Sequence, residues 1–451
     1  MGSHTLAALT VTAMLVRPSA VQAQGTGEGF VITGARVFDG ERSHSGKSIV
    51  VTGGIIRALV DDPSEWRHLP TVDGTGATLM PGLIDAHTHT RNVTQLQQAL
   101  RFGVTTVLDM FTVPAADFVL RAAAAARVDI ADFRSAGILA TAPGGHGTEY
   151  GVVIPTVASA ADAEAFVRSR KEAGADYLKI VLNGVRAARD GTPTMNKATT
   201  EALVRAAHSR GMLVVAHIES TDDVRIAVGS GVDGLVHIWR QGGAAPAVAE
   251  LVAQRKVFVI PTVATPDGFV KGSGVPLATD PRLRPFLSDS ITKRLASRAQ
   301  GPVLENIEPF LAAVSSLHAA GARILAGSDV PNAITVHGVS LHRELELLVR
   351  AGLSPTEALM SATASVAVAF RLLDRGRIAP GCRADLLLVR GDPTNDITTT
   401  RDILRVWRAG IEFDRRLESP TPAHDGRSPL NHAMKAAPAG DLTAGALAHC
   451  G

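Results

Sequence analysis

Six residues whose side chains bind divalent metals or move protons lie within or just after short apolar runs of the sequence. They are His87, His89, Lys179, His217, His237 and Asp329. Imidazole and carboxylate groups are common ligands of zinc and related metals. A carboxylate held beside a metal can also accept a proton during hydrolysis. The chemistry that such a set could perform is therefore metal-assisted hydrolysis.

The first half of this set has ordinary interpretations as well. In the run Asp85-Ala86-His87-Thr88-His89, strand alternation points both imidazoles the same way, so they could share one metal or simply be polar residues at a strand end. The same alternation turns Lys179 into the protein interior. An interior lysine is paired with an inner Asp or Glu, deprotonated or chemically modified.

The second half is equally ambiguous when each residue is taken alone. His217 and His237 each close a short apolar run, and a single histidine there is typical of a satisfied strand end. Asp329 closes Ile324-Leu325-Ala326-Gly327-Ser328-Asp329, where an isolated aspartate is typical of a helix cap. The set is more informative than its members, because all six positions would meet at one rim if the runs were parallel strands of one barrel.

The elements that must position these residues alternate between buried strands and helices. We expect eight strands, at residues 79–89, 105–110, 133–140, 177–182, 213–218, 234–238, 258–262 and 323–329. Helical stretches lie between them, for example at residues 161–173, 199–210 and 304–320, each followed by glycine. Eight such units predict an α/β protein with a (β/α)₈ TIM barrel over residues 79–373.

The two ends of the chain differ from the barrel. Short strand-like runs in residues 25–78 and again in 375–418 predict a small β-sandwich module built from both chain ends. Residues 1–23 resemble a signal peptide, with an apolar run followed by a small-residue cleavage site, which predicts a periplasmic or secreted protein and otherwise a cytoplasmic one. Residues 419–451 are rich in Pro, Ala, Gly and His, and we expect a tail without regular structure.

With its ligand order and framing phrases, the sequence resembles the amidohydrolase superfamily, in its binuclear metal-dependent subtype. The phrases are Met80-Pro81-Gly82-Leu83-Ile84-Asp85, Leu353-Ser354-Pro355-Thr356-Glu357-Ala358-Leu359 and Pro380-Gly381-Cys382-Arg383-Ala384-Asp385-Leu386. Within the superfamily, the sequence resembles the imidazolonepropionase-like branch, which includes metal-dependent dipeptidases and amidases. The resemblance covers residues 30–415.

The resemblance implies a function for each of the six residues. His87, His89 and Asp329 would bind one metal ion, His217 and His237 a second, and Lys179, carbamylated by carbon dioxide, would bridge the two. Zinc is the expected metal for this nitrogen and oxygen set. A hydroxide bridging the metals would attack an amide, carbamate or peptide-like carbonyl, while Asp329 transfers a proton to the leaving group.

The sequence offers fewer candidates for residues that contact the substrate. His146, in the glycine-rich Pro143-Gly144-Gly145-His146-Gly147, could touch substrate or cap a turn, and His337 is a further candidate because it follows Asp329 closely. Dipeptidases of this branch place a tyrosine two residues after the fifth-strand histidine to hold the substrate carboxylate. The residue here is Glu219, a poor partner for a carboxylate, which argues against recognition of a free C-terminus. We expect His208 and His342 to be solvated.

Several other functions remain open at this point. The same metal pair could hydrolyse lactones or phosphotriesters, and a mononuclear deaminase or cyclic amidine hydrolase could use the same fold, although those enzymes lack a bridging lysine. A non-catalytic relative would have lost ligands, yet all six positions are filled. The net charge is +2 among 451 residues, and no run of Lys and Arg is interleaved with aromatic residues, which argues against nucleic acid as a partner. With 45% apolar residues, the composition is that of a globular protein, and we expect its partner to be a small-molecule substrate. No run is long enough to span a membrane, and a homo-oligomer is compatible with the sequence.

Overall fold

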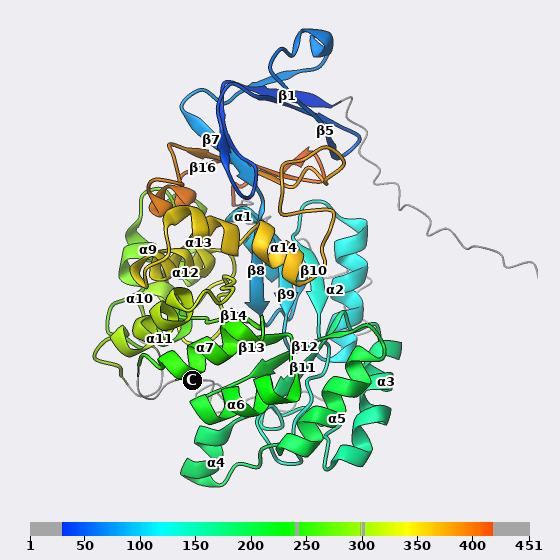
Figure 1. Ribbon diagram of the computed structural model, residues 1–451. Coiled ribbons are helices and arrows are strands. Elements are labelled where there is room, and N and C mark those ends of the chain that lie inside the picture. Colours follow the sequence, from blue (N-terminus) through cyan, green and yellow to red (C-terminus); the bar gives the residue numbers. More distant parts are fainter. Residues whose placement is uncertain (1–28, 240–242, 298, 300–302, 418–451) are drawn as a thin grey trace, which may run out of the picture.

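The computed structural model describes residues 29–239, 243–297, 299 and 303–417, which form a strand-rich module beside a larger α/β barrel (Figure 1). The predicted signal peptide, residues 1–23, and the predicted tail, residues 419–451, lie outside the described residues. Within the described ranges, every helix is too short or too polar to cross a bilayer.

The small module is a sandwich of two sheets. One sheet has the order β5-β4-β1-β6, and the other β17-β16-β15-β7-β2-β3. Strands from both chain ends share the second sheet, where Leu388 of β15 lies opposite Leu79 of β7. Between the sheets, the Phe30 ring stacks on Trp407 with a centroid distance of 5.4 Å. The strands are β1 (Phe30–Thr33), β2 (Arg36–Phe38), β3 (Ser43–His44), β4 (Ser48–Thr52), β5 (Ile55–Val60), β6 (Thr71–Asp73), β7 (Ala77–Pro81), β15 (Leu386–Arg390), β16 (Ile403–Arg408) and β17 (Ile411–Glu412).

The single strand predicted over residues 79–89 is in fact two strands. β7 belongs to the small module, and β8 (Leu83–Thr88) begins the barrel. Gly82 lies between them, where a Cβ atom would approach the Cγ2 atom of Thr105 to 2.3 Å. Glycine is therefore required at this crossing, because any side chain would collide with the neighbouring strand. The apolar run continues through both strands, so its pattern could not reveal the break.

The barrel strands form a closed ring. The regular strands are β8, β9 (Val104–Asp109), β10 (Asp132–Ser135), β11 (Tyr177–Val181), β12 (Leu213–His217), β13 (Gly234–Val236) and β14 (Phe258–Ile260). Between β10 and β11, the amide of Ala140 donates to the carbonyl of Lys179 at 2.8 Å. On the other side, Leu325 donates to Val259 at 2.8 Å and Ala86 to Ala326 at 3.0 Å, so residues 323–329 join β14 to β8. This segment takes the place of the predicted eighth strand without being a regular strand, and the predicted third strand is regular only to Ser135.

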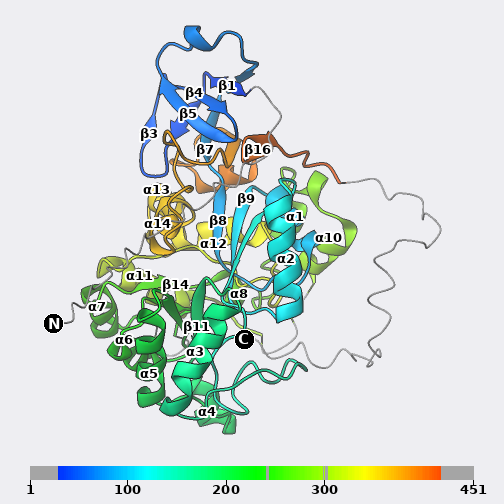
Figure 2. The same ribbon diagram turned by 90° about the vertical axis from the view of Figure 1, so that its right-hand side faces the viewer.

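Helices cover the outside of the ring (Figures 1 and 2). The helix predicted from residue 304 begins at Glu308 with proline in its first turn, a position that proline favours because its missing amide is not needed there. In Figure 1 the arrow of β8 points away from the small module, so the carboxyl ends of the strands open on the far side. The helices are α1 (Val93–Arg101), α2 (Pro114–Ala126), α3 (Ala163–Glu172), α4 (Gly184–Asp190), α5 (Lys197–His208), α6 (Thr221–Ser230), α7 (Pro246–Gln254), α8 (Ala264–Asp267), α9 (Val275–Thr279), α10 (Asp289–Ala296), α11 (Glu308–Ala319), α12 (Val339–Arg350), α13 (Pro355–Ser361) and α14 (Ala364–Ala369).

Candidate metal centre

Three ligand atoms meet where β8 and residues 323–329 end. The Nε2 atoms of His87 and His89 lie 3.3 Å apart, and each lies 3.2 Å from Oδ1 of Asp329. In a tetrahedral zinc site with bonds of about 2.0–2.1 Å, neighbouring ligand atoms lie about 3.3–3.4 Å apart. The three atoms thus have the spacing of one face of such a site. The pairing of β8 with β9 shifts register between Asp85 and Thr88, so regular alternation does not extend through this pair, yet both imidazoles contact Asp329.

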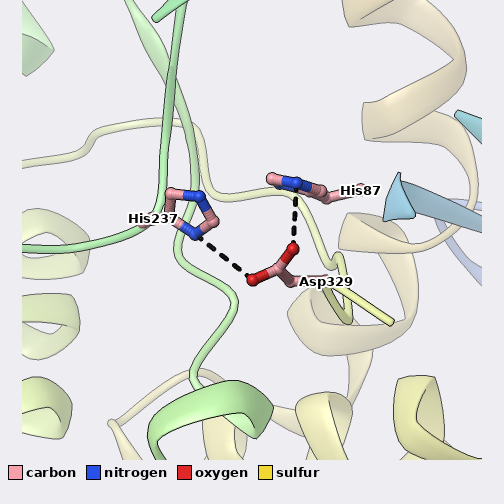
Figure 3. Close-up of side chains that lie close together, drawn as sticks. All are labelled: His87, His237 and Asp329. Carbon is pink, nitrogen blue, oxygen red and sulfur yellow. Dashed lines mark ion pairs between the residues drawn. The ribbon is translucent and has the colours of Figure 1, made fainter. Parts of the chain in front are cut away.

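A second pair of histidines adjoins this triangle from β12 and the end of β13. The rings of His217 and His237 lie 4.5 Å apart between centroids, and His237 lies 4.8 Å from His87. Nδ1 of His237 is 3.8 Å from Oδ2 of Asp329. Among the described residues, His87, His237 and Asp329 form a group whose ligand atoms all lie within 4.8 Å of one another (Figure 3).

Lys179 on β11 lines the same cavity as these residues. Its strand alternates as predicted, since Leu178 and Ile180 pack toward the helices in the outer core, whereas Tyr177 belongs to the inner cluster. Burial lowers the pKa of Lys179 to about 7, although the charges of Asp329 and Asp109 oppose the shift. Its side chain is buried, and these two carboxylates act on it through their charges.

The electrostatics favour neutral imidazoles beside a charged carboxylate. Burial lowers the pKa of His87 to about 3 despite the nearby charge of Asp329. Burial and the charge of His217 likewise hold the pKa of His237 well below its usual range. For Asp329, burial alone would raise the pKa, but His87 and His237 together with hydrogen bonds from His87 and His89 hold it well below its ordinary value. Neutral imidazole and ionised carboxylate are the forms that bind metals, so these residues fit divalent ions.

Three non-glycine residues with strained backbones lie at the same place. His237, Thr262 and Asp329 have positive φ angles of 72°, 52° and 51°. Side chains rarely adopt this region, and strained residues of this kind cluster at functional sites. Thr262 also contacts the metal centre directly, because its Oγ1 lies 2.8 Å from Nδ1 of His237. The sequence pattern gave no signal for Thr262, since a threonine after a buried strand is unremarkable.

Asp85 is a second supporting residue that the sequence left without a function. Its carboxylate accepts hydrogen bonds from the amide and hydroxyl of Ser328 and from the amide of His87 at 3.2 Å. It therefore ties the strand of His87 to the segment that carries Asp329. Burial raises the pKa of Asp85 to about 7, against the effect of these hydrogen bonds. Its position within the phrase that ends in His-Thr-His was the available signal.

The three predicted substrate residues have different environments. A cavity of about 330 Å³ opens above the metal centre, and His146 lines it. Glu219 and His337 are buried, but neither is among the described residues that line this cavity. Burial lowers the pKa of His337 to about 3, against a hydrogen bond with the backbone of His89, so His337 supports the ligand segment. Arg186 and Tyr150, which the sequence did not single out, line the cavity.

The expectation that His342 is solvated was wrong. Its ring is fully buried, with Nε2 2.9 Å from the carbonyl oxygen of Phe102 and Nδ1 3.0 Å from Oγ1 of Thr400. It is a structural histidine that joins α12 to neighbouring segments. His208 is partly exposed and lies 2.9 Å from Asp233, at the surface as predicted.

Comparison with known proteins identifies the family. The profile of the amidohydrolase family matches residues 78–411. This chain belongs to the amidohydrolase family. The superfamily assignment and the barrel fold predicted from the sequence are thereby confirmed. Amidohydrolases depend on metals, and the cluster around Asp329 is the candidate site for them in this member.

Individual relatives agree with this assignment over different lengths. A stretch of 96 residues is 40% identical to an imidazolonepropionase of Deinococcus deserti, covering 20% of this chain and 24% of that protein. Another of 132 residues is 27% identical to an adenine deaminase of Lysinibacillus sphaericus, covering 28% of this chain and 22% of that protein. The chain thus spans about a quarter of the length of these curated relatives.

Solved structures share the fold over most of the chain. A Xaa-Pro dipeptidase with bound methionine has a TM-score of 0.68 at 22% identity, covering 86% of this amidohydrolase and 100% of that chain. The ochratoxinase of A. niger has a TM-score of 0.66 at 20% identity, covering 85% and 95%. Both likenesses concern the fold, so the substrate must be argued from the cavity of this chain.

Proposed function

We propose that this amidohydrolase hydrolyses an amide or related carbon–nitrogen bond of a small molecule, using two divalent metal ions. One observation carries the proposal. The triangle of His87, His89 and Asp329 adjoins the pair of His217 and His237 at the floor of a cavity large enough for a small substrate. The family match and the likeness to amide-cleaving hydrolases support the same reaction.

The metal ligands and the proton acceptor would come from the five residues of the two ligand groups. His87, His89 and Asp329 would hold one ion, and His217 and His237 the other. When bound, the ions supply Lewis-acid activation of water and of the scissile carbonyl. Asp329 is ionised and buried at the centre, so it can accept a proton from the attacking water and deliver it to the leaving nitrogen.

Lys179 is proposed to carry a carbamate that contacts both ions. Carbamylation would convert a buried cation into an anion with two oxygen atoms, which relieves the cost of burying an ammonium group and offsets metal charge. Lys179 lines the same cavity as residues of both ligand groups, which supports this interpretation. Zinc is the proposed metal because the ligand atoms are nitrogen and oxygen at tetrahedral spacing.

Metal counting and a substrate panel test the proposal. Elemental analysis of active protein should give two metal ions per chain, and chelation should abolish activity that added zinc restores. Bicarbonate labelled with carbon-13 should produce a carbamate resonance that is missing in Lys179→Ala. One metal per active chain, with adenine deaminated and no amide cleaved, would replace this proposal with a mononuclear deaminase.

Export is a separate proposal that depends on the sequence of residues 1–23 alone. Mass spectrometry of the protein from its native host should show a mature start at or near Gln24. An intact Met1 on mature protein in the cytoplasm would contradict it.

A further inference from the structure

The lining of the cavity above the metal centre combines a polar and an apolar set of side chains. The loop that follows β10 and helix α4, which follows β11, contribute polar groups, namely His146, Tyr150 and Arg186. The long connection after β14 contributes apolar groups, including Phe269, Leu304 and Phe310. Because these polar and apolar groups line the same cavity as the ligand residues, a substrate cleaved there can contact both sets.

The polar residues that line the cavity can donate hydrogen bonds, and the glutamates that contact them are not part of the lining. Among the described lining residues, Asp329 on the floor is the sole carboxylate. Glu219, which is fully buried, accepts hydrogen bonds from Nε of Arg186 at 3.3 Å and from the Arg186 amide at 3.1 Å. Glu219 thus holds the Arg186 side chain in one orientation, which lowers the entropic cost of binding an anion to the guanidinium.

Glu149 has the same relation to the neighbouring histidine. Its Oε1 lies 2.5 Å from Nδ1 of His146, its Oε2 accepts from the amide of Gly147 at 2.5 Å, and NH1 of Arg186 lies 3.4 Å from it. Glu149 is ionised, since hydrogen bonds from His146 and Gly147 outweigh burial and hold its pKa at about 2. Both glutamates therefore orient donors toward the cavity without lining it themselves.

The hydrogen bonds to Arg186 change how Glu219 is expected to affect an anionic substrate. In sequence alone, a glutamate at this position opposes a substrate carboxylate. In the fold, the Glu219 carboxylate is hydrogen-bonded to Arg186, and of these two residues Arg186 is the one that lines the cavity. The residue that appeared to exclude an anion instead positions the group that can bind one.

We propose that Arg186, positioned by Glu219, binds the carboxylate of the substrate, and that the substrate is an N-acyl amino acid whose acyl group is apolar. The acyl group would lie against Phe269 and Phe310, with the scissile bond above the metal centre. Hydrolysis breaks the carbon–nitrogen bond, so the water oxygen joins the acyl carbon and a water proton joins the amine nitrogen. That the bound N-acyl amino acid is a substrate rests on the proposed function, whereas recognition of its carboxylate can be measured by binding alone.

The test uses a ligand pair that the enzyme cannot cleave. N-(4-toluenesulfonyl)-phenylalanine and its primary carboxamide differ in one charge, and their binding to the zinc-loaded protein can be measured by calorimetry. The free acid should bind about 10-fold to 100-fold more tightly, as expected for a hydrogen-bonded charge pair. The double variant Arg186→Met/Glu219→Gln should bind both equally. Both residues are changed because Glu219 alone would remain as a buried unpaired charge.

Two further variants keep the test decisive. Arg186→Lys, which retains the charge but not the planar donor fork, should show an intermediate preference. Arg210→Met/Glu164→Gln removes an arginine–glutamate pair at the surface and should leave the preference unchanged. An acid preference that survives in the Arg186/Glu219 variant, or its absence in the parent protein, would overturn the proposal. Failure of every amide to be cleaved would instead defeat the proposed function, because the binding preference does not depend on turnover.

Discussion

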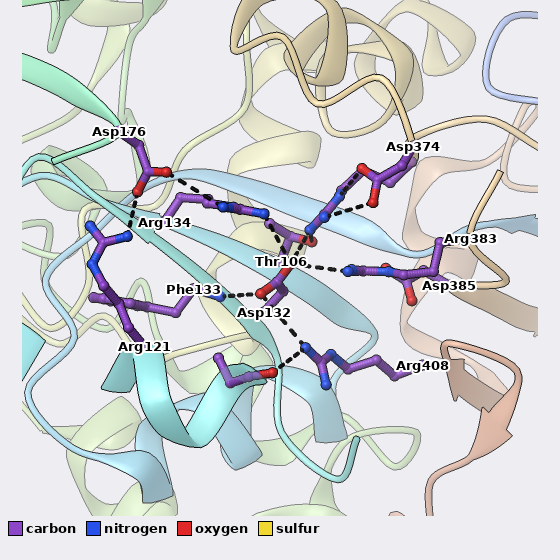
Figure 4. Close-up of polar contacts among 12 residues, drawn as sticks. Thr106, Arg121, Asp132, Phe133, Arg134, Asp176, Asp374, Arg383, Asp385 and Arg408 are labelled. Atoms are coloured by element: carbon purple, nitrogen blue, oxygen red, sulfur yellow. Dashed lines mark hydrogen bonds and ion pairs between the residues drawn. The ribbon is translucent and has the colours of Figure 1, made fainter. Parts of the chain in front are cut away.

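Buried charges gather at both ends of this barrel, and the two clusters are built differently. At the mouth, Asp329 is surrounded by histidines. At the base, Asp132 at the start of β10 is surrounded by arginines, which include Arg375, Arg383 at 3.0 Å and Arg408 at 3.6 Å (Figure 4). Arg383 and Arg408 come from the C-terminal part of the chain, so the base cluster joins the small module to the barrel.

The difference lies in whether the partners carry a permanent charge. Burial would raise the pKa of Asp132, but the positive charges of Arg375 and Arg383 hold it well below its usual range. Guanidinium groups stay charged at all relevant pH values, so the base cluster is complete without any ligand. Burial lowers the pKa of His87 and His237, two of the histidines around Asp329, so they give the carboxylate no permanent cation. The same residue type is therefore structural at one end and suited to metal at the other.

The sharpest test of this contrast is Asp329→Asn. The amide keeps the size of the side chain but cannot accept a proton, so we expect kcat to fall by about 10²-fold to 10⁴-fold. Metal content should be largely retained, and the loss should appear in kcat rather than in substrate binding. Steady-state kinetics with elemental analysis measure both. A variant with two metals and near-normal kcat would contradict the proton transfer assigned to Asp329.

At the base, Asp132→Asn should affect stability rather than chemistry. Removing one partner of a buried ionic cluster leaves uncompensated arginines, and we expect the free energy of unfolding to fall by about 3–5 kcal/mol. Activity of the folded protein should persist. Asp129→Asn is the control, because Asp129 pairs with Arg127 at the surface rather than in a buried cluster; a loss below about 1 kcal/mol is expected there. If both substitutions lowered the free energy of unfolding equally in urea, the base cluster would stabilise the fold no more than a surface ion pair.

Support for the metal centre can be tested at Thr262. Thr262→Val removes the hydroxyl beside Nδ1 of His237 while keeping the shape of the side chain. Loss of a group that orients a metal-binding histidine weakens metal affinity by about 10-fold to 100-fold, and competition with a chelator measures this. Thr200→Val, which removes a buried hydroxyl on α5, should leave metal affinity unchanged. If both variants retained full affinity, Thr262 would have no positioning effect.

The smallest expected effect is the pH dependence of the base cluster. The pKa of Asp132 is depressed below its ordinary value of 3.8 in the folded protein. Its contribution to stability is therefore present above about pH 4 and is lost as the pH falls toward the depressed value, because the unfolded chain takes up the proton first. Between pH 5 and pH 3, the stability difference between the parent and Asp132→Asn should shrink by about 1 kcal/mol. A difference that stays constant over this range would contradict the assignment.

The sequence by itself determined the fold class and the residues at the barrel mouth. Alternation on β11 correctly placed Lys179 inside, and the positions of His217 and Asp329 after buried runs correctly indicated a shared rim. These inferences succeed because strand periodicity and parallel topology are local properties that dictate where a strand ends and which side chains meet.

Tertiary structure alone decided what those residues contact. The break at Gly82, the irregular eighth segment and the positive φ of Asp329 depend on close approach between segments distant in sequence. Glu219 illustrates the same point, since its meaning depends on Arg186, which lies on a different segment 33 residues away. The charge of a side chain can be read from its residue type, but its direction and its partner are fixed by packing in three dimensions, where long-range contacts determine which buried groups are satisfied.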